Sequence, residues 1–288
     1  MNKFPDWLKK RFIATPEYIK TKTILKDLDI NTVCQHSLCP NMNECFGRSH
    51  ATFMILGKAC TRGCRFCAVE KGQPEDVDRG EPKRIKEAVF KLSLKHVIIT
   101  SVTRDDLDDG GAEQFVNTIN EIRSIGGDIT IEILTPDFKG KKESVEKVTM
   151  AKPDIFGHNI ETVPSLYKNV CADACYGLSL NLLREVKKAD NSMLTKSGIM
   201  LGLGEKESEV LEVFKDLIGA NCDILTIGQY LKPHKDALEV REFIHPSAFL
   251  RLKEEALSYG FKHVESGPFV RSSYYDNKDM LTKLCSRN

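Results

Sequence analysis

The sequence predicts an α/β fold with a parallel sheet, because short apolar runs alternate with amphipathic segments from about residue 51 onward. Six runs rich in Ile, Val and Thr have the composition of buried strands. They lie at 51–57, 96–102, 129–135, 154–160, 198–204 and 223–229. Such a series implies parallel strands joined by right-handed crossovers, and both a doubly wound sheet and a barrel-like curl fit it.

Each predicted helix has apolar residues three and four positions apart, as in Ile85, Ala88, Val89 and Leu92. The helices are expected at 82–94, 111–125, 141–150, 163–170, 179–190 and 206–219, with a last one at 246–259. In either architecture the reactive loops lie at the carboxyl ends of the strands. A loop that begins at Cys60, soon after the first strand, is therefore expected at that edge of the sheet.

Composition indicates an ordinary soluble globular protein, with 41% hydrophobic and 29% charged residues. The net charge of +1 disfavours a nucleic-acid partner. No run approaches the roughly 18 apolar residues of a membrane helix, and the first residues lack the apolar core of a secretory signal. Ten cysteines are too sparse for a disulfide scaffold. We therefore expect reduced thiols, no membrane partner and a cytoplasmic location.

One cysteine triplet has the spacing C-x3-C-x2-C and consists of Cys60, Cys64 and Cys67. Gly63 allows a tight loop, and Arg62 and Arg65 can offset the negative charge of an iron–sulfur cluster. A zinc site is the alternative, but zinc normally takes four ligands, so the fourth would have to come from elsewhere. With Phe66 before the last cysteine, the motif is typical of radical S-adenosylmethionine enzymes. In those enzymes three thiolates leave one iron free for S-adenosylmethionine.

A second triplet has the spacing C-x4-C-x5-C and consists of Cys34, Cys39 and Cys45. Taken alone, it could be a zinc knuckle with His36 or His50 as fourth ligand. Beside the other triplet, a second iron–sulfur cluster is the better interpretation.

The two triplets, together with Arg271-Ser272-Ser273-Tyr274, resemble the lipoyl synthase family. The resemblance covers nearly the whole chain after the first 30 residues, in the order of the family. It includes TSVTRDDLDDGGAEQF (100–115), IEILTPDFKG (131–140), HNIETVPSLY (158–167), TKSGIMLGLGE (195–205), TIGQYLKP (226–233) and GFKHVESGPFVRSSY (260–274). The family implies a partial (β/α)6 barrel of the TIM type.

The resemblance also implies a division of the chain. Residues 1–50 would be an N-terminal extension carrying the auxiliary cluster ligands, 51–260 the radical S-adenosylmethionine barrel, and 261–288 a closing tail. The implied reaction is a sulfurtransferase reaction that inserts two sulfur atoms, at carbons 6 and 8 of a protein-bound octanoyl group. The sulfur would come from an auxiliary 4Fe–4S cluster, while the other 4Fe–4S cluster would cleave S-adenosylmethionine.

Ligands and contacts are carried over from the resemblance residue by residue. Cys60, Cys64 and Cys67 match the radical cluster, and Cys34, Cys39 and Cys45 the auxiliary cluster. The family places a serine of the RSSY motif on the auxiliary cluster, which we assign to Ser273, with Ser272 as the fallback. An alkoxide is harder than a thiolate and should leave more readily; a hydroxyl that bonds local backbone is the ordinary alternative. The expected contacts of S-adenosylmethionine are Phe66, Glu132, Asn159 and Gly202.

The expected partners are octanoylated lipoyl carrier domains, such as the glycine cleavage H protein or 2-oxoacid dehydrogenase subunits. A reductant such as flavodoxin or ferredoxin and an iron–sulfur carrier for cluster repair are also implied. Glu132 could equally form a structural ion pair, and the charges from Arg104 to Asp109 could be a solvated run. Cys171, Cys175, Cys222 and Cys285 are interpreted as small buried hydrophobic residues. The rivals are a sulfur-inserting enzyme of the biotin synthase type and a non-catalytic zinc or iron–sulfur protein.

Overall fold

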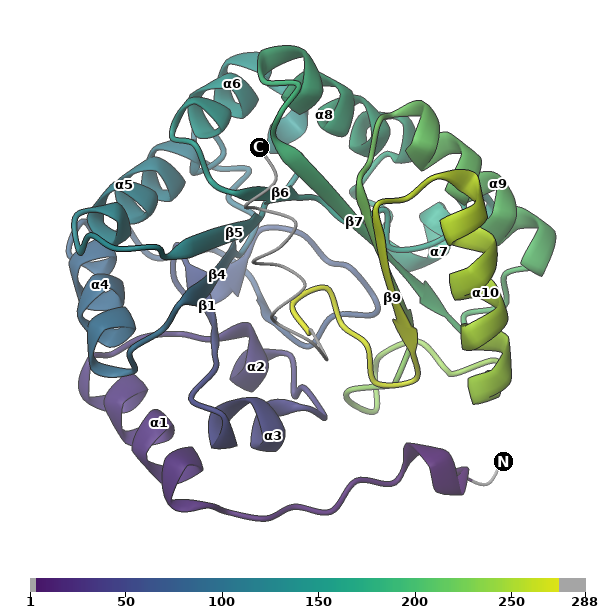
Figure 1. Cartoon of the computed structure of the whole chain (residues 1–288), viewed down its shortest axis with the longest axis horizontal. Helices are drawn as coiled ribbons and strands as arrows, with labels where there is room; N and C mark the ends of the chain where they lie inside the picture. Colours follow the sequence, from purple (N-terminus) through teal and green to yellow (C-terminus); the bar gives the residue numbers. More distant parts are fainter. Residues whose placement is uncertain (1–3, 275–288) are drawn as a thin grey trace.

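The main feature of the computed structural model, which describes residues 4–274, is one seven-stranded parallel sheet (Figure 1). Its strands are β1 (Thr52–Ile55), β4 (His96–Ser101), β5 (Thr130–Leu134), β6 (Ile155–Gly157), β7 (Leu194–Leu201), β8 (Ile224–Gln229) and β9 (His263–Gly267). Every neighbouring pair is parallel. The strands lie in the sheet in chain order, so the order never reverses. This excludes the doubly wound alternative, which requires a reversal.

The sheet curls into a partial barrel, as expected, and helices cover its outer face (Figure 1). The covering helices are α4 (Glu81–Lys91), α5 (Ala112–Arg123), α6 (Lys142–Met150), α8 (Tyr176–Ala189), α9 (Glu207–Gly219) and α10 (Pro246–Tyr259). Strands β1 and β9 are the two edges and do not pair with each other, so the barrel is open between them. The predicted helix at 163–170 is instead a 3-10 turn, η3 (Pro164–Leu166), followed by the short α7 (Tyr167–Val170).

Two strands differ from the sequence prediction because they carry buried charges. Strand β7 begins at Leu194, four residues before the predicted start, because Lys196 is buried within it and pairs with Glu132. Strand β9 was not predicted as a strand at all. It contains His263 and Glu265, whose side chains lie 2.9 Å apart and satisfy each other inside the sheet. Polar residues that are buried in a strand, with a partner on the same or another strand, interrupt the apolar pattern on which strand prediction depends.

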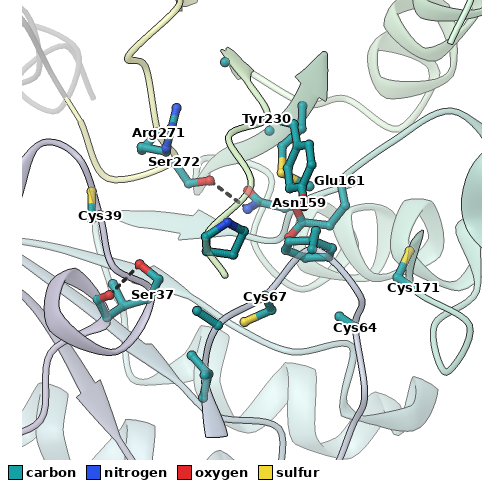
Figure 2. Close-up of a pocket in the computed structure, with 18 of the residues that line it drawn as sticks. Ser37, Cys39, Cys64, Cys67, Asn159, Glu161, Cys171, Tyr230, Arg271 and Ser272 are labelled. Carbon is teal, nitrogen blue, oxygen red and sulfur yellow. Dashed lines mark hydrogen bonds between the residues drawn. The ribbon is translucent and has the colours of Figure 1, made fainter. Parts of the chain in front are cut away.

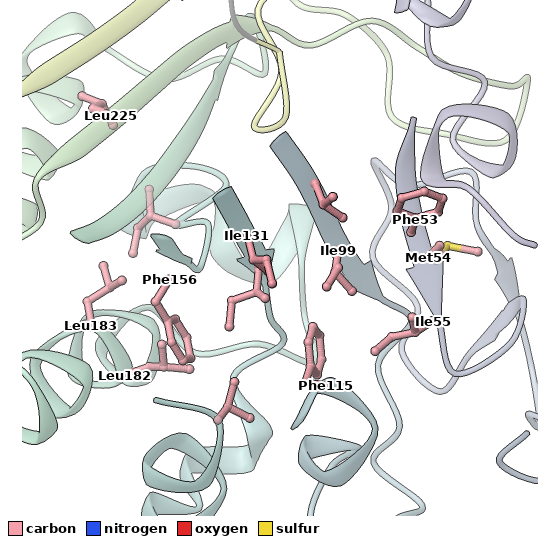
Figure 3. Packing of buried hydrophobic residues seen from close by; sticks show 14 of the residues in the cluster. Phe53, Met54, Ile55, Ile99, Phe115, Ile131, Phe156, Leu182, Leu183 and Leu225 are labelled. Carbon is pink, nitrogen blue, oxygen red and sulfur yellow. The ribbon is translucent and has the colours of Figure 1, made fainter. Parts of the chain in front are cut away.

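Apolar side chains fill the space between the sheet and its helices (Figure 3). Phe53, Ile99 and Ile131 from the strands, with Phe115 from α5 and Phe156 from β6, are fully buried. Burial of each such side chain stabilises the fold by about 1.5–3 kcal/mol. A separate cluster inside the barrel, near the start of the strands, consists of Ile98, Ile155, Leu194 and Ile224. This cluster lies at the end of the barrel where the strands begin, its lower end, so the carboxyl ends of the strands are left for a site.

The N-terminal segment packs beside β1 as helices α1 (Pro16–Asp27), α2 (Val33–His36) and α3 (Met42–Gly47), preceded by the 3-10 turn η1 (Asp6–Leu8). Helix α1 begins with Thr15 as N-cap and Pro16 in its first turn, the usual start of a helix. Thr21 donates a hydrogen bond to the carbonyl of Phe46, which ties α1 to α3. Within residues 4–274 no helix has the length and apolar character that crossing a membrane requires.

Candidate functional site

The loop of Cys60, Cys64 and Cys67 is closed by two short parallel strands, β2 (Ala59–Cys60) and β3 (Glu70–Lys71). It follows β1 directly and therefore lies at the carboxyl edge of the sheet, as predicted. The backbone N–H of Thr103, after β4, points at the Cys60 sulfur at 3.3 Å. Burial raises the pKa of Cys64 to about 12 and that of Cys67 to about 11. Ligation by these thiols must therefore displace protons, as metal binding generally does.

Arg62 fixes this loop to the ends of two barrel strands. Its guanidinium lies 2.7 Å from Asp105, which follows β4, and 2.6 Å from Asp137, which follows β5. Burial alone would lower the pKa of Arg62, but the hydrogen bonds that it donates to the two carboxylates raise it above its usual range. Arg62 thus has two carboxylate partners within the protein, and its effect on the charge of a cluster stays a prediction. In the charged segment after β4, Arg104 is buried, which the alternative of a solvated run did not expect, whereas Asp106 and Asp108 are exposed as it did.

The second triplet is carried by α2, α3 and the turn between them. Cys34 is buried in α2, and the N–H of Cys39 donates to the carbonyl of Cys34 at 3.1 Å. Cys45 lies in α3, and its N–H donates to the carbonyl of Asn41 at 2.9 Å. Burial raises the pKa of Cys34 to about 11 and that of Cys45 to about 12. All three thiols line one small cavity of about 60 Å³.

The RSSY segment reaches both triplets after β9. Ser273 lines the small cavity together with Cys34, Cys39 and Cys45. Ser272 instead accepts a hydrogen bond from the amide nitrogen of Asn159, at 2.7 Å. The two serines are thus placed differently, and Ser273 is the one that shares the small cavity with all three cysteines of the second triplet.

Arg271 supplies a test of whether a cluster fits beside Cys39. Its guanidinium donates to the carbonyl of Val270 at 2.6 Å, and no carboxylate of residues 4–274 lies within ion-pair distance. Burial lowers the pKa of Arg271, and the neighbouring Cys39 thiol opposes that shift. A cation that is partly removed from water and has no counter-ion is costly. An anionic cluster held by the three thiolates would provide the missing negative charge, so the residues present fit the group.

One large cavity of about 850 Å³ connects the two triplets inside the barrel. Figure 2 shows Cys39 on one side, Cys64 and Cys67 on the other, and the Asn159–Ser272 hydrogen bond between them. Five of the six clustered cysteines line it, namely Cys34, Cys39, Cys60, Cys64 and Cys67. Much of the rest of its wall is apolar, with Met54, Val69, Leu134, Ile199 and Met200. Such a wall suits an alkyl chain lying between two reactive centres.

Among residues 4–274, no three His, Cys, Asp or Glu side chains converge as ligands of a single metal ion would. The thiols of each triplet instead line a space. A four-iron cluster places each thiolate on a different iron, so its ligands surround a volume and do not meet at one point.

Phe66 and Asn159, two of the four expected contacts of S-adenosylmethionine, line the large cavity. Gly202 does not. It lies just after β7 with a φ of +96°, and a Cβ there would come within 2.2 Å of the Gln229 amide nitrogen. The turn and this close approach account for the glycine without a ligand, and its contact with the cofactor stays a prediction.

Glu132 is also absent from the cavity wall. Its carboxylate lies 2.7 Å from Lys196 and 3.3 Å from His96 near the lower end of the barrel, so it forms the structural ion pair that was the alternative. Burial opposes ionisation of Glu132, but Lys196 and His96 together lower its pKa to about 2.

Lys196→Met should therefore destabilise the fold by about 3–5 kcal/mol, because it removes the ammonium group that faces a buried carboxylate. Urea unfolding at pH 7 measures the change, with Lys91→Met in an exposed pair as control. The folded-state pKa of Glu132 is lowered, so the pair stabilises above the usual carboxyl range and ceases to do so as the pH falls toward 2. The difference in the free energy of unfolding between wild type and Lys196→Met should become smaller in acid. A difference that does not depend on pH would contradict this account.

Glu161 is a cavity residue that the sequence analysis did not select. It lies just after β6 with a φ of +63°, and burial raises the pKa of its carboxyl group to about 7. Its backbone is fixed to β7 by hydrogen bonds with Gly198 and Met200. The only available signal was its place in the segment 158–167, where Asn159 and Glu161 alternate along one stretch.

The remaining cysteines confirm the expected burial in part. Cys171 and Cys222 are buried, and Cys171 also lines the large cavity. Cys175 is exposed, so the expectation was wrong there, because it lies outside the start of α8 at the N-cap position. Cys285 lies outside the described residues.

Comparisons with known proteins agree with this geometry. A family model of the Radical SAM superfamily matches residues 54–217. The lipoyl synthase of Caldanaerobacter subterraneus is 54% identical over 271 residues, which cover 94% of this chain and 95% of that protein. The lipoyl synthase of Caldicellulosiruptor saccharolyticus is 52% identical over 272 residues, with the same coverage of 94% and 95%.

Solved structures with low sequence identity share the fold. Methylornithine synthase (PylB) is 12% identical, with a TM-score of 0.54 over 95% of this chain and 92% of that one. Streptococcus suis SuiB bound to S-adenosylmethionine is 14% identical, with a TM-score of 0.57 over 72% of this chain and 46% of that one. At this level of identity the likeness supports the barrel architecture alone.

Proposed function

Because this chain belongs to the lipoyl synthase family of the Radical SAM superfamily, we propose that it inserts two sulfur atoms into a protein-bound octanoyl group. The observation that carries the proposal is one large cavity lined by cysteines of both triplets, all of them except Cys45. A substrate chain in that cavity has one triplet on each side, so both centres can act on it without its release. A biotin synthase type of enzyme is less well supported, since the RSSY segment and the upstream triplet both contribute to this cavity.

The thiolates of Cys60, Cys64 and Cys67 would hold the cluster that engages S-adenosylmethionine. Those of Cys34, Cys39 and Cys45, with the Ser273 hydroxyl, would hold the auxiliary cluster; this assignment is supported by their shared cavity. When bound, the first cluster with its S-adenosylmethionine supplies a hydrogen-abstracting radical, and the second supplies sulfur.

The chain's own residues bind and orient the reactants. Asn159 and Glu161 present polar groups to the cavity at the end of β6, where the polar parts of S-adenosylmethionine would find partners. The amide oxygen of Asn159 is buried and has no hydrogen-bond partner within residues 4–274, which leaves it for such a ligand. The apolar wall with Met54, Leu134 and Met200 holds an alkyl chain and excludes water from it.

The proposed partners follow from this reaction. An octanoylated carrier domain, such as the glycine cleavage H protein or a 2-oxoacid dehydrogenase subunit, would present the acyl chain. A flavodoxin or ferredoxin would supply electrons, and an iron–sulfur carrier would rebuild the auxiliary cluster. Within the chain we propose the division into 1–50, 51–260 and 261–288, although β9 makes residues 263–267 part of the sheet.

Metal analysis after anaerobic reconstitution tests this function against a zinc-binding or non-catalytic alternative. We expect about eight irons per chain, four for each triplet. Zinc with little iron would exclude the proposal. About four irons would leave only one cluster and would remove the source of sulfur.

Ser273→Ala should reduce carbon–sulfur bond formation about 10-fold or more, the cost typical of weakening a metal site, while cleavage of S-adenosylmethionine changes little. Ser272→Ala is the matched control, because Ser272 bonds Asn159 instead. Lipoyl product and 5′-deoxyadenosine are measured separately in each variant. Equal losses of both products in Ser273→Ala, or a larger loss of lipoyl product in Ser272→Ala, would contradict the assignment.

A further inference from the structure

Lys10 connects the N-terminal segment to the second triplet and to the tail. Its ammonium nitrogen donates to the side-chain oxygen of Asn41 at 2.6 Å and lies 3.0 Å from the Glu44 carboxylate. The same nitrogen lies 4.4 Å from the ring centre of Phe269 and 5.8 Å from that of Tyr274, within cation–π range. Three parts of the chain that are distant in sequence therefore meet at one lysine.

Glu44 and Asn41, the two partners of Lys10, also bind the tail directly. The Tyr274 hydroxyl donates to the second oxygen of Glu44 at 3.1 Å. The amide nitrogen of Asn41 donates to the carbonyl of Phe269 at 2.6 Å, and Asn41 is 1% exposed. Hydrogen bonds to a charged carboxylate are stronger than neutral ones. The contacts therefore form one connected network and do not act as separate surface pairs.

The network lies on both sides of the proposed auxiliary site, in each of the two chain segments that build it. Asn41 and Glu44 lie between Cys39 and Cys45, and Phe269 and Tyr274 lie on either side of Ser273. Because each cysteine-side residue contacts a tail-side residue, the network sets how closely the serine approaches the thiols. The Ser272–Asn159 bond holds the opposite side of the tail to the barrel.

We propose that Lys10, Glu44 and Tyr274 form a clasp that positions Ser273 at the second cysteine triplet; the clasp rests on the function proposed above. They are positioning residues, since they act through Ser273 and the cysteines, and Glu44 and Tyr274 also line the small cavity. Lys10 is central because it satisfies the carboxylate, the amide and an aromatic ring at once. Its loss should loosen the tail locally and leave the barrel and the Cys60–Cys67 loop unaffected.

The test uses Lys10→Met and Tyr274→Phe in the full chain, with Lys9→Met as matched control. Within residues 4–274 the ion pair of Lys9 is with Asp6, which is not part of the clasp. Amide exchange is first followed by mass spectrometry in the cluster-free protein. The peptide spanning 268–274 contains the protected N–H groups of Val270 and Tyr274. Its exchange should become about tenfold or more faster in both clasp variants, the factor that loss of one charge-assisted hydrogen bond gives.

The second readout is iron release to a chelator from the reconstituted protein. In the clasp variants the half of the iron assigned to the second triplet should leave about tenfold faster, while the other half and the cleavage of S-adenosylmethionine follow the control. Exchange and iron release equal to those of Lys9→Met would overturn the clasp. So would an equal rise in exchange of the 60–72 peptide, which would indicate general loosening. Wild-type protein that holds only four irons would overturn the proposed function instead, and the exchange measurement would still decide whether the clasp exists.

Discussion

Cys64→Ala is expected to abolish production of 5′-deoxyadenosine and, with it, all lipoyl product. Cys64 lies in the middle of the loop that β2 and β3 close, and it lines the large cavity. A cluster with two thiolates in place of three loses a ligand from its first coordination sphere. The loss should exceed the roughly 10- to 100-fold that removal of a second-shell contact costs. Chromatography of the nucleoside products measures it.

Cys171→Ala is the matched control for this variant. Cys171 is also buried and also lines the large cavity, but it belongs to neither triplet. It should keep cleavage of S-adenosylmethionine and about eight irons. Normal cleavage by Cys64→Ala, or equal inactivation by Cys171→Ala, would contradict the assignment of the radical triplet.

Cys39→Ala is expected to separate the two half-reactions. It removes a thiol of the second triplet beside Arg271 and leaves the loop of Cys60, Cys64 and Cys67 intact. Production of 5′-deoxyadenosine should persist, while lipoyl product falls to background and the iron content drops to about four per chain. Mass spectrometry of the carrier peptide and metal analysis give the two readings.

The same variant has two contrary outcomes. Lipoyl product from Cys39→Ala would show that sulfur reaches the substrate from another source. If Cys39→Ala lost both S-adenosylmethionine cleavage and sulfur insertion, the two centres would depend on each other for folding. The separate elements that carry the two triplets do not predict this. Cys222→Ala, a buried cysteine away from both cavities, controls for loss of a small hydrophobic side chain.

Much of the barrel could be predicted because its strands are apolar runs and its helices have regular spacing. The prediction was incomplete where buried charges are paired. Because of Lys196 the first four residues of β7 were not predicted as strand, and because of His263 and Glu265 β9 was not predicted at all. The doubly wound and barrel alternatives could not be separated from the alternation alone, since both obey the same crossover rule. The spatial order of the strands decided between them.

The site was predictable to the extent that cysteine spacing carries the chemistry. The loop of Cys60, Cys64 and Cys67 lies at the expected edge of the sheet, and the spacing of the cysteines was enough to find both triplets. Contacts that depend on long-range packing were not. Glu132 faces Lys196, 64 positions away, and Ser273 meets the second triplet only through the course of the tail. Glu161 could not be selected from the sequence, because its role depends on the end of β6 facing the large cavity.

Sulfur insertion on a defined substrate tests the central claim most directly. The protein is reconstituted with heavy-isotope sulfide, freed of excess sulfide, and incubated anaerobically with an octanoylated lipoyl-domain peptide, S-adenosylmethionine and a reductant. The account predicts a peptide that gains two sulfur atoms, both heavy, because they come from the centre held at Cys34, Cys39 and Cys45. An unchanged octanoyl peptide despite cleavage of S-adenosylmethionine, or a product with light sulfur, would contradict it.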